Sequence, residues 1–201
     1  MSFRKLFLIV ALFLIFPFSS HSFLVLRLNL EQLTSLSDRI FVGRCLEVKP
    51  AKDKGGRLVQ YVTYEVTETL KGAPEERITF KQIRLGEGGE RGDFTTTTAF
   101  SDLPNYEVGE ENVIFLSGES DIGLTAPVGL LQGKFQIVTN AKGEKRVVNG
   151  LGNKGLFLGL SKSPRVKALT LSTRERKMME SASSTPSLQD FVSLVKKLVT
   201  D

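Results

Sequence analysis

The sequence predicts a mainly β fold, an antiparallel β-barrel or sandwich with a short N-terminal helix and a C-terminal amphipathic helix. Three observations indicate this class. About six short apolar or alternating segments are separated by turn residues, helical periodicity occurs only near the ends, and strands do not alternate with helices. The length of 201 residues suits one domain that can build its own core.

The first 22 residues are typical of a secretory signal peptide. Arg4 and Lys5 precede an apolar run at 6–16, and Ser20 and Ser22 follow as small residues near a cleavage site. This run is shorter than the roughly 20 apolar residues that span a bilayer. We therefore predict export to the periplasm or the medium, with cleavage after Ser22; an uncleaved N-terminal membrane anchor is the alternative. Cleavage would lower the net charge from +5 to +3, because it removes two cations and no acid.

The mature chain opens with a helical pattern and continues with strands. Leucines at 30, 33 and 36 recur at a spacing that favours a short helix. Residues 58–67 alternate strictly, with Val62, Tyr64 and Val66 on one face, which is the clearest strand pattern of the chain. Residues 140–143 have the composition of a hairpin turn. Further strands are predicted at residues 40–48, 77–85, 95–100, 112–117, 130–139 and 145–149.

The composition changes after Leu160, where basic residues dominate. Small residues and Pro186 follow, and a final amphipathic pattern begins at Ser187, which forms a capping box with Asp190. We predict four segments: a signal peptide at 1–22, a β-barrel domain at 23–160, a basic linker at 161–187 and a C-terminal helix at 188–201.

Residue counts exclude several chemistries. The single histidine, His21, lies in the predicted signal peptide, so the mature chain would lack an imidazole for Ser-His-Asp or Cys-His catalysis, zinc binding or pH switching. The single cysteine, Cys45, cannot form an internal disulfide and is expected to be a buried thiol in a strand.

A glycine motif and the carboxylate pairs do not change this expectation. Residues 150–155 read G-x-G-x-x-G, but Gly159 and Pro164 leave little room for the helix that a dinucleotide site needs, so turn glycines are predicted. Neighbouring acids such as Glu75 and Glu76 do not by themselves place two carboxylates across a cleft. We predict no catalytic residues, no cofactor and no metal site.

Two groups of charged residues are candidates for contact with a partner. Loops 86–93 and 118–129 would lie on one rim of the barrel, where loops commonly carry binding residues. The basic stretch 162–177 suits an anionic surface such as phospholipid headgroups. The candidate loop residues are Glu87, Glu90, Arg91, Asp93, Glu119 and Asp121. The candidate anionic-surface contacts are Lys162, Arg165, Lys167, Arg174, Arg176 and Lys177.

Three stretches in this order resemble a known arrangement: residues 37–48 (SDRIFVGRCLEV), 64–72 (YEVTETLKG) and 108–116 (VGEENVIFL). They are similar to the oligosaccharide/oligonucleotide-binding (OB)-type barrels of netrin-like modules and tissue inhibitors of metalloproteinases. They resemble more closely a group of uncharacterised exported bacterial proteins, which residues 129–135 (GLLQGKF) also resemble. The resemblance covers residues 30–160.

This resemblance implies an OB-like barrel with helices packed outside and a role in protein binding outside the cytoplasm. The inhibitors act through an N-terminal cysteine that chelates the zinc of the protease. Here the predicted mature terminus is Phe23, and Cys45 lies well inside the chain. The inhibitory mechanism therefore does not transfer, and the disulfides of the animal modules have no counterpart.

Three functions follow as hypotheses. The first is an exported, non-enzymatic binding module that contacts an unknown protein in the cell envelope or outside the cell through its rim loops. The alternative is a peripheral envelope or membrane-associated protein that the basic C-terminal segment holds on an anionic lipid surface. A hydrolase that uses Ser-Lys or paired carboxylates is a minor third. Nucleic-acid binding is not expected, because the chain is predicted to be exported and has three tyrosines and no tryptophan.

Overall fold

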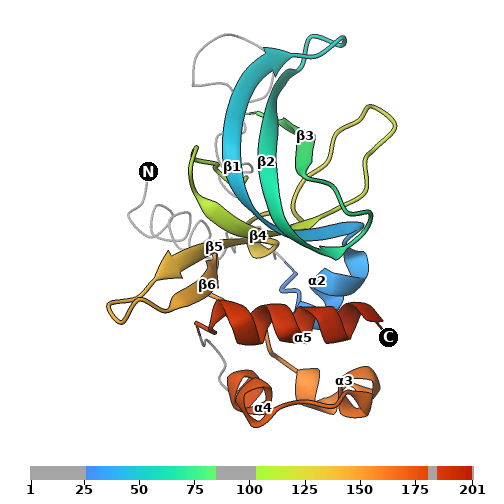
Figure 1. The fold of residues 1–201 in the computed structure, drawn as a ribbon. Coiled ribbons are helices and arrows are strands. Elements are labelled where there is room, and N and C mark those ends of the chain that lie inside the picture. Colours follow the sequence, from blue (N-terminus) through green and yellow to red (C-terminus); the bar gives the residue numbers. More distant parts are fainter. Residues whose placement is uncertain (1–25, 85–102, 181–184, 201) are drawn as a thin grey trace, which may run out of the picture.

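The computed structural model describes residues 26–84, 103–180 and 185–200 (Figure 1). Its elements in chain order are α2 (Leu30–Leu36), β1 (Arg39–Lys52), β2 (Leu58–Lys71), β3 (Arg77–Ile83), β4 (Glu111–Leu116), η1 (Leu130–Gln132), β5 (Lys134–Thr139), β6 (Lys145–Asn149), η2 (Leu160–Lys162), α3 (Pro164–Ala168), α4 (Thr173–Glu180) and α5 (Leu188–Thr200). The predicted signal peptide and the predicted strand at 95–100 lie outside the described residues. Across the described ranges, no helix has both the length and the apolar character needed to cross a membrane.

All six strands form one antiparallel sheet in the order β3-β2-β1-β4-β5-β6. The prediction of a mainly β antiparallel fold is confirmed. In the described part of the chain, however, no ladder joins β3 to β6, so the sheet is open. Closure into a barrel, and with it the OB-like character, is not confirmed.

Strands β1 and β2 form a long curved hairpin that rises away from the rest of the sheet (Figure 1). Strand β1 pairs with β2 along most of its length but with β4 only from Arg39 to Arg44, and its register shifts near Gly43. A side chain at Gly43 would not fit, because its Cβ would lie 2.6 Å from the backbone oxygen of Glu65. This close approach and the irregular register accompany the bend of the strand.

Strand β1 also runs further than the sequence pattern indicated, through Pro50 to Lys52. Pro50 lies opposite Gln60 in the ladder with β2. Hydrogen-bonded and non-hydrogen-bonded residue pairs alternate along an antiparallel ladder. Asp53 and Arg57 form a hydrogen-bonded pair, in which the Asp53 N–H donates to Arg57 O at 3.0 Å. Three residues further along, Pro50 and Gln60 therefore form a non-hydrogen-bonded pair, and the Pro50 nitrogen points away from β2. The missing N–H of proline therefore removes no bond of this ladder.

The two faces of the sheet carry separate hydrophobic cores. On one face, side chains of β1, β4, β5 and β6 pack against α2 and α5; we call this the helix-side core, with Phe115, Phe135 and Phe191 at its centre. On the other face, the curved strands enclose the strand-side core, which includes Tyr64, Phe80 and other buried residues. Strand β4 contributes to both, and all five residues Asn112–Leu116 are buried, as its continuous apolar pattern predicted.

The helices at both ends begin at side-chain caps. Asn29 and Gln32 form a reciprocal capping box at the start of α2. At the start of α5, Ser187 Oγ accepts a hydrogen bond from the backbone N–H of Asp190 at 3.1 Å. Within the segment predicted as a basic linker, the chain forms α3 and α4. Figure 1 shows these two helices as a layer beneath α5, on the side away from the sheet.

The turns follow their glycine and asparagine residues. Asn140–Gly143 closes the β5–β6 hairpin, with the Asn140 N–H donating to Glu144 O at 3.0 Å and Gly143 at φ 78°. The G-x-G-x-x-G stretch winds through consecutive turns and leads to no helix directly, in agreement with turn glycines. Buried Asn153 fixes these turns, since its Nδ2 donates to Val147 O at 2.9 Å.

Candidate functional site

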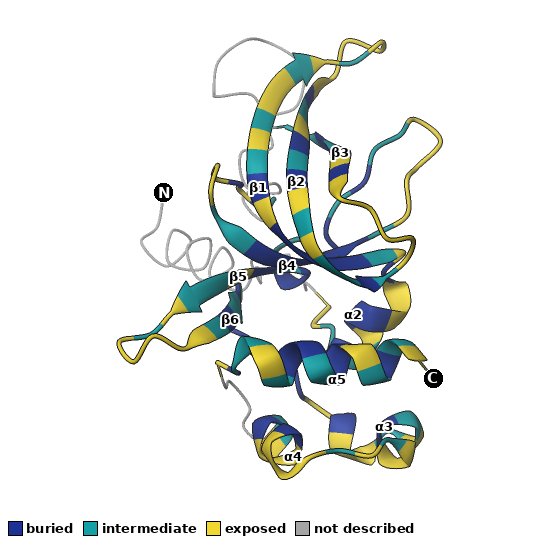
Figure 2. Cartoon of the chain, in the orientation of Figure 1, coloured by how far each residue is buried: buried dark blue, intermediate teal, exposed yellow. Residues whose placement is uncertain are grey.

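A surface with predominantly positive charge lies on the segment 160–180, which carries η2, α3 and α4 and which we call the basic layer. Figure 2 shows that the outer sides of α3 and α4 are largely exposed. The exposed cations of this layer are Lys162, Lys167, Arg174, Arg176 and Lys177, and its exposed acid is Glu180. In the described structure, Lys162, Lys167, Arg174 and Lys177 form no ion pair. The layer therefore presents a net positive face.

Two of the six predicted anionic-surface residues have internal partners instead. Arg165 is half-buried and donates to the carbonyl oxygen of Leu198 at 2.6 Å, near the C-terminal end of α5. A cation is favoured there because helix carbonyls carry partial negative charge. Arg176 donates to Leu171 O at 3.1 Å but stays exposed. Arg165 thus attaches α3 to α5, and the other five cations face outward.

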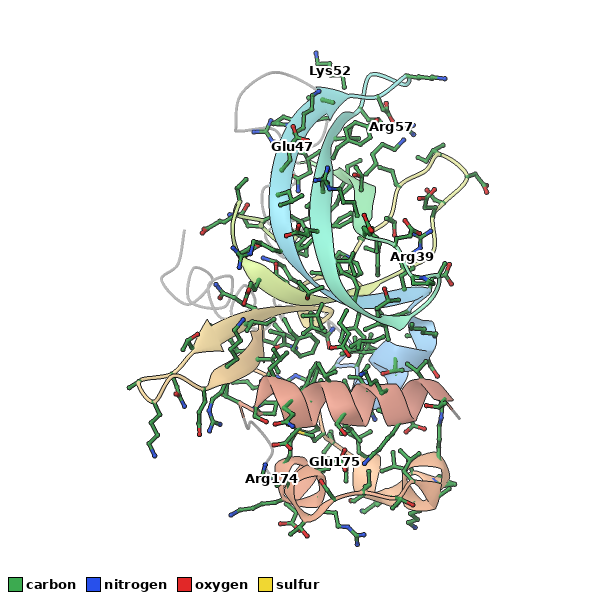
Figure 3. All side chains as sticks on the ribbon, viewed as in Figure 1. Arg39, Glu47, Lys52, Arg57, Arg174 and Glu175 are labelled. Carbon is green, nitrogen blue, oxygen red and sulfur yellow. The ribbon has the colours of Figure 1, made fainter. Side chains whose placement is uncertain are left out.

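A buried carboxylate attaches α4 to α5. The side chain of Glu175 is 1% exposed and accepts bonds from Lys197 Nζ at 2.8 and 2.6 Å and from Ser193 Oγ at 2.8 Å. The backbone N–H of Ser172 donates to it at 2.6 Å. Burial alone would raise the pKa of Glu175, but these hydrogen bonds, led by Lys197, hold that pKa below its usual value. Figure 3 shows Glu175 between the two helices and Arg174 at the outer end of α4.

A groove of about 880 Å³ lies between the β5–β6 hairpin, α4 and the first turns of α5. Its walls carry both signs of charge. Lys196 pairs with Glu68 at 2.5 Å and Arg146 with Glu144 at 3.1 Å, while Arg174 lines the groove with no ion pair in the described structure. Because most of these charges are already paired, the groove adds little to the positive field of the basic layer.

The predicted loop residues have two different outcomes. Glu87, Glu90, Arg91 and Asp93 lie outside the described residues, whereas Glu119 and Asp121 are exposed on the segment 117–127. This segment is held against β3, because Thr125 N–H donates to Lys81 O at 2.9 Å and Lys81 Nζ donates to Ile122 O at 2.5 Å. It presents its two carboxylates on a defined turn, but they do not line the groove beside α5.

The strand-side core is the other place where polar groups gather. Tyr64 donates to Asn112 Oδ1 at 2.5 Å, and Tyr106 donates to Gln82 Oε1 at 2.9 Å. Burial, and then the nearby Glu110 carboxylate, raise the pKa of both tyrosines, so both hydroxyls stay protonated. Cys45 is 1% exposed beside them, as the sequence predicted, and burial raises its pKa too. A protonated, enclosed thiol is a poor nucleophile.

The carboxylates with shifted pKa values serve as ion-pair partners. Hydrogen bonds from Lys145 and Arg44 hold the pKa of Glu111 below its usual value, and bonds from Asn140 and Arg146 do the same for Glu144. A general acid at neutral pH needs the opposite shift. Among the described residues, no group of three His, Cys, Asp or Glu side chains is placed to hold a metal ion.

Sequence reasoning identified the cations but missed the carboxylate that positions them. Glu175 is the single acid of the basic stretch 162–177, and its surroundings in the sequence gave no sign of burial. The available signal was local: Ser172 and Glu175 have capping-box spacing, and Ser172 Oγ does accept from the Glu175 N–H at 3.2 Å. This spacing predicts the start of a helix at residue 173, which is where α4 begins.

Comparison of the chain with protein-family models, with curated proteins and with solved structures finds no match. The resemblance to netrin-like modules therefore stays a prediction, and the candidate site is defined by the geometry of the basic layer.

Proposed function

We propose that this protein is an exported, non-enzymatic binding module whose basic layer associates with an anionic surface of the cell envelope. The observation that carries the proposal is the composition of this layer, with five exposed cations against one exposed acid. Each Lys or Arg close to an anionic membrane contributes about 1 kcal/mol of binding free energy, which salt reduces. Five such residues are enough for reversible association without a deep pocket.

The packing of the layer also supports this role. Glu175 and Arg165 fix α4 and α3 on α5, and α5 belongs to the helix-side core through Phe191, Leu194, Val195 and Leu198. The cations are thus displayed by a rigid platform rather than by a solvated tail. Predicted export places this platform in the envelope, where anionic lipid surfaces occur.

The test uses the protein recovered from the cell envelope, with its amino terminus determined by mass spectrometry. Its sedimentation with vesicles of phosphatidylcholine, with or without phosphatidylglycerol, is measured at low and high salt. The variant K162E/K167E/K177E reverses three outward cations. It should bind anionic vesicles at least about a hundredfold more weakly, because three contacts near 1 kcal/mol are lost.

The matched control is K49E/K52E/K54E, which makes the same charge change on the β1–β2 hairpin. All three of these lysines are exposed, and Figure 3 shows Lys52 at the end of the molecule far from Arg174. The control should bind like the unchanged protein. Equal losses in both variants, or binding that ignores salt and anionic lipid, would refute the proposal.

A second function, contact with a protein partner, is favoured by the fixed turn at 117–127. Ile122 is 44% exposed there; it follows Asp121, and its carbonyl oxygen accepts the hydrogen bond from Lys81. A photo-crosslinking residue at position 122 should yield one discrete adduct in intact cells. The same residue at exposed Lys142, on the β5–β6 turn, is the control and should yield none. Identical adduct patterns at both positions would remove this candidate.

We keep the OB-like relationship as part of the proposal. Its support is the segment 117–127, which connects β3 with β4. Leu124 pairs with Lys81 of β3, and Pro127 pairs with Leu116 of β4. If this bridge persists in solution, the Thr125 amide, which donates to Lys81 O, should exchange slowly with solvent. Fast exchange would count against a barrel-like closure.

A further inference from the structure

The two most exposed large apolar side chains of the described structure belong to segments that lie side by side. Leu158 is 74% exposed and Leu26 is 71% exposed. The incoming chain docks on the turn that carries Leu158, because Leu30 N–H donates to Leu156 O at 2.8 Å and Asn29 Nδ2 donates to Leu158 O at 3.1 Å. Two leucines far apart in sequence are thereby presented by one docked pair of segments.

Leu158 is held outward by a fixed backbone. Its neighbours Leu156, Phe157 and Leu160 are 1%, 4% and 0% exposed, so both sides of the turn are embedded in the helix-side core. The Leu158 N–H donates to Gly155 O at 3.0 Å, which closes the turn. Because the backbone of this turn is held at both ends, Leu158 cannot become buried by a small shift of the chain. Leu158 therefore projects as a rigid apolar point.

Exposed cations precede and follow Leu158 in the sequence. Lys154 and Lys162 lie four residues before and after Leu158, and both are exposed. The Arg27 side chain lies over Gly155, since a Cβ there would be 3.5 Å from Arg27 Cδ. Glu31 is the nearby acid, and it accepts a bond from Ser163 Oγ at 2.9 Å. An apolar tip among cations suits the boundary between anionic headgroups and acyl chains, whereas a soluble polyanion would use only the cations.

We propose that this face, formed by Leu26, Leu158, Arg27, Lys154 and Lys162, rests on an anionic lipid bilayer with Leu158 inserted at its boundary. This inference rests on the proposed function and names its anionic surface as a lipid bilayer. Lys162 belongs both to this face and to the basic layer.

The experiment uses the absence of tryptophan from the sequence. The variant L158W carries a single tryptophan whose emission reports its surroundings, and the whole protein is used in the form recovered from cells. With vesicles of phosphatidylcholine and phosphatidylglycerol, its emission should shift to the blue, and brominated acyl chains should quench most of it. The control V108W replaces a side chain that is 68% exposed beside Glu107 and Glu110, and its emission should stay unchanged.

Sedimentation of the same samples separates the two proposals. If L158W binds the vesicles but keeps a solvent-like, unquenched emission, the proposed insertion of Leu158 is refuted and the proposed association with an anionic surface stands. If the protein does not bind anionic vesicles at all, both the proposed function and the insertion of Leu158 are refuted. A second variant, L158S, should bind anionic vesicles more weakly than V108S at the same salt concentration, because it lacks the inserted apolar side chain. Equal binding of L158S and V108S would also overturn the insertion.

Discussion

The hydrophobic cores on the two faces of the sheet differ in their residue composition. The helix-side core is built on aliphatic residues and four phenylalanines, and polar groups buried beside it, such as Asn149 and Asn153, have hydrogen-bond partners. The strand-side core mixes aromatic rings with buried amides, and among the described residues Gln82 Nε2 and Asn112 Nδ2 have no partner. A buried polar group without a partner costs about 1–3 kcal/mol. We infer that most of the stability lies on the face that carries the basic layer.

The largest expected effect tests the helix-side core. Phe191 of α5 is fully buried, with ring centroids 4.8 Å from Phe135 and 6.2 Å from Phe115. Phe191→Ala should lower the free energy of unfolding by about 3–5 kcal/mol, because it leaves a cavity between helix and sheet. Denaturant titration measures the change. Leu36→Ala, at a residue 59% exposed, is the control and should change stability by at most about 0.5 kcal/mol.

A small effect of Phe191→Ala would mean that α5 is not fixed to the sheet.

The same packing explains why deletion of residues 161–201 is a poor test of membrane association. Such a deletion removes Phe191 and the rest of α5 from the core, so loss of binding would report unfolding. Charge reversal on the outer side of the basic layer avoids this problem.

The matched change in the strand-side core should cost less. Phe80 is 2% exposed and packs against Tyr106 at a centroid distance of 5.7 Å. Phe80→Ala should cost about 3 kcal/mol, at the low end of the range for such truncations, because water in the new cavity can accept from the nearby Gln82 amide. Denaturant titration of the two alanine variants side by side gives the comparison. A larger loss for Phe80→Ala than for Phe191→Ala would reverse the order of the two cores.

The next effect concerns the polar attachment of the basic layer. Glu175→Gln removes the charge that pairs with Lys197 and should cost about 2 kcal/mol at neutral pH. Because the folded-state pKa of Glu175 is lowered, its contribution is present above the unfolded pKa of about 4.3 and is lost as the pH falls through the folded value. Unfolding titrations at pH 7 and pH 3 should therefore show a smaller difference between variant and parent at pH 3. A constant difference would contradict this assignment.

The sequence predicted the strands more closely than it predicted the outer helices, for a physical reason. Strands in a half-buried sheet alternate, and the alternation of Val62, Tyr64 and Val66 is visible without a structure. Helix α4 buries Glu175 and Met178 and half-buries Met179, so one of the two fully buried positions is charged and the helix lacks an apolar pattern at helical spacing. Its place depends on Lys197, which lies 22 residues further along the chain.

The open sheet could not be predicted from local patterns either. Closure depends on whether the two edge strands, β3 and β6, pair with each other, and the sequences of these strands do not indicate whether they do. The candidate site divides in the same way. The cations of the basic layer were identified from composition, whereas the role of Arg165 depends on the position of Leu198. The exposure of Leu158 depends on which of its neighbours enter the core.

A smaller effect tests one polar pair of the strand-side core. Tyr106→Phe removes the hydroxyl that donates to Gln82 and leaves the buried Gln82 amide without this hydrogen bond. It should cost about 1–2 kcal/mol, because a buried acceptor loses its donor. Denaturant titration measures it, and Tyr61→Phe, at a residue 38% exposed, is the control with no expected change. Equal values for the two variants would show that the Tyr106 bond contributes nothing.

The smallest expected effect is the most informative about the strand-side core. Replacing both partners, in Tyr106→Phe/Gln82→Met, removes the hydroxyl and the whole amide, including the Nε2 group, which has no partner among the described residues. The double variant should therefore lie within about 1 kcal/mol of the parent and be more stable than Tyr106→Phe alone, because apolar replacement of a buried pair is nearly neutral. A double-mutant cycle measures the coupling. If the double variant is less stable than the sum of the single changes, the buried amide has a partner or a role that apolar packing cannot replace.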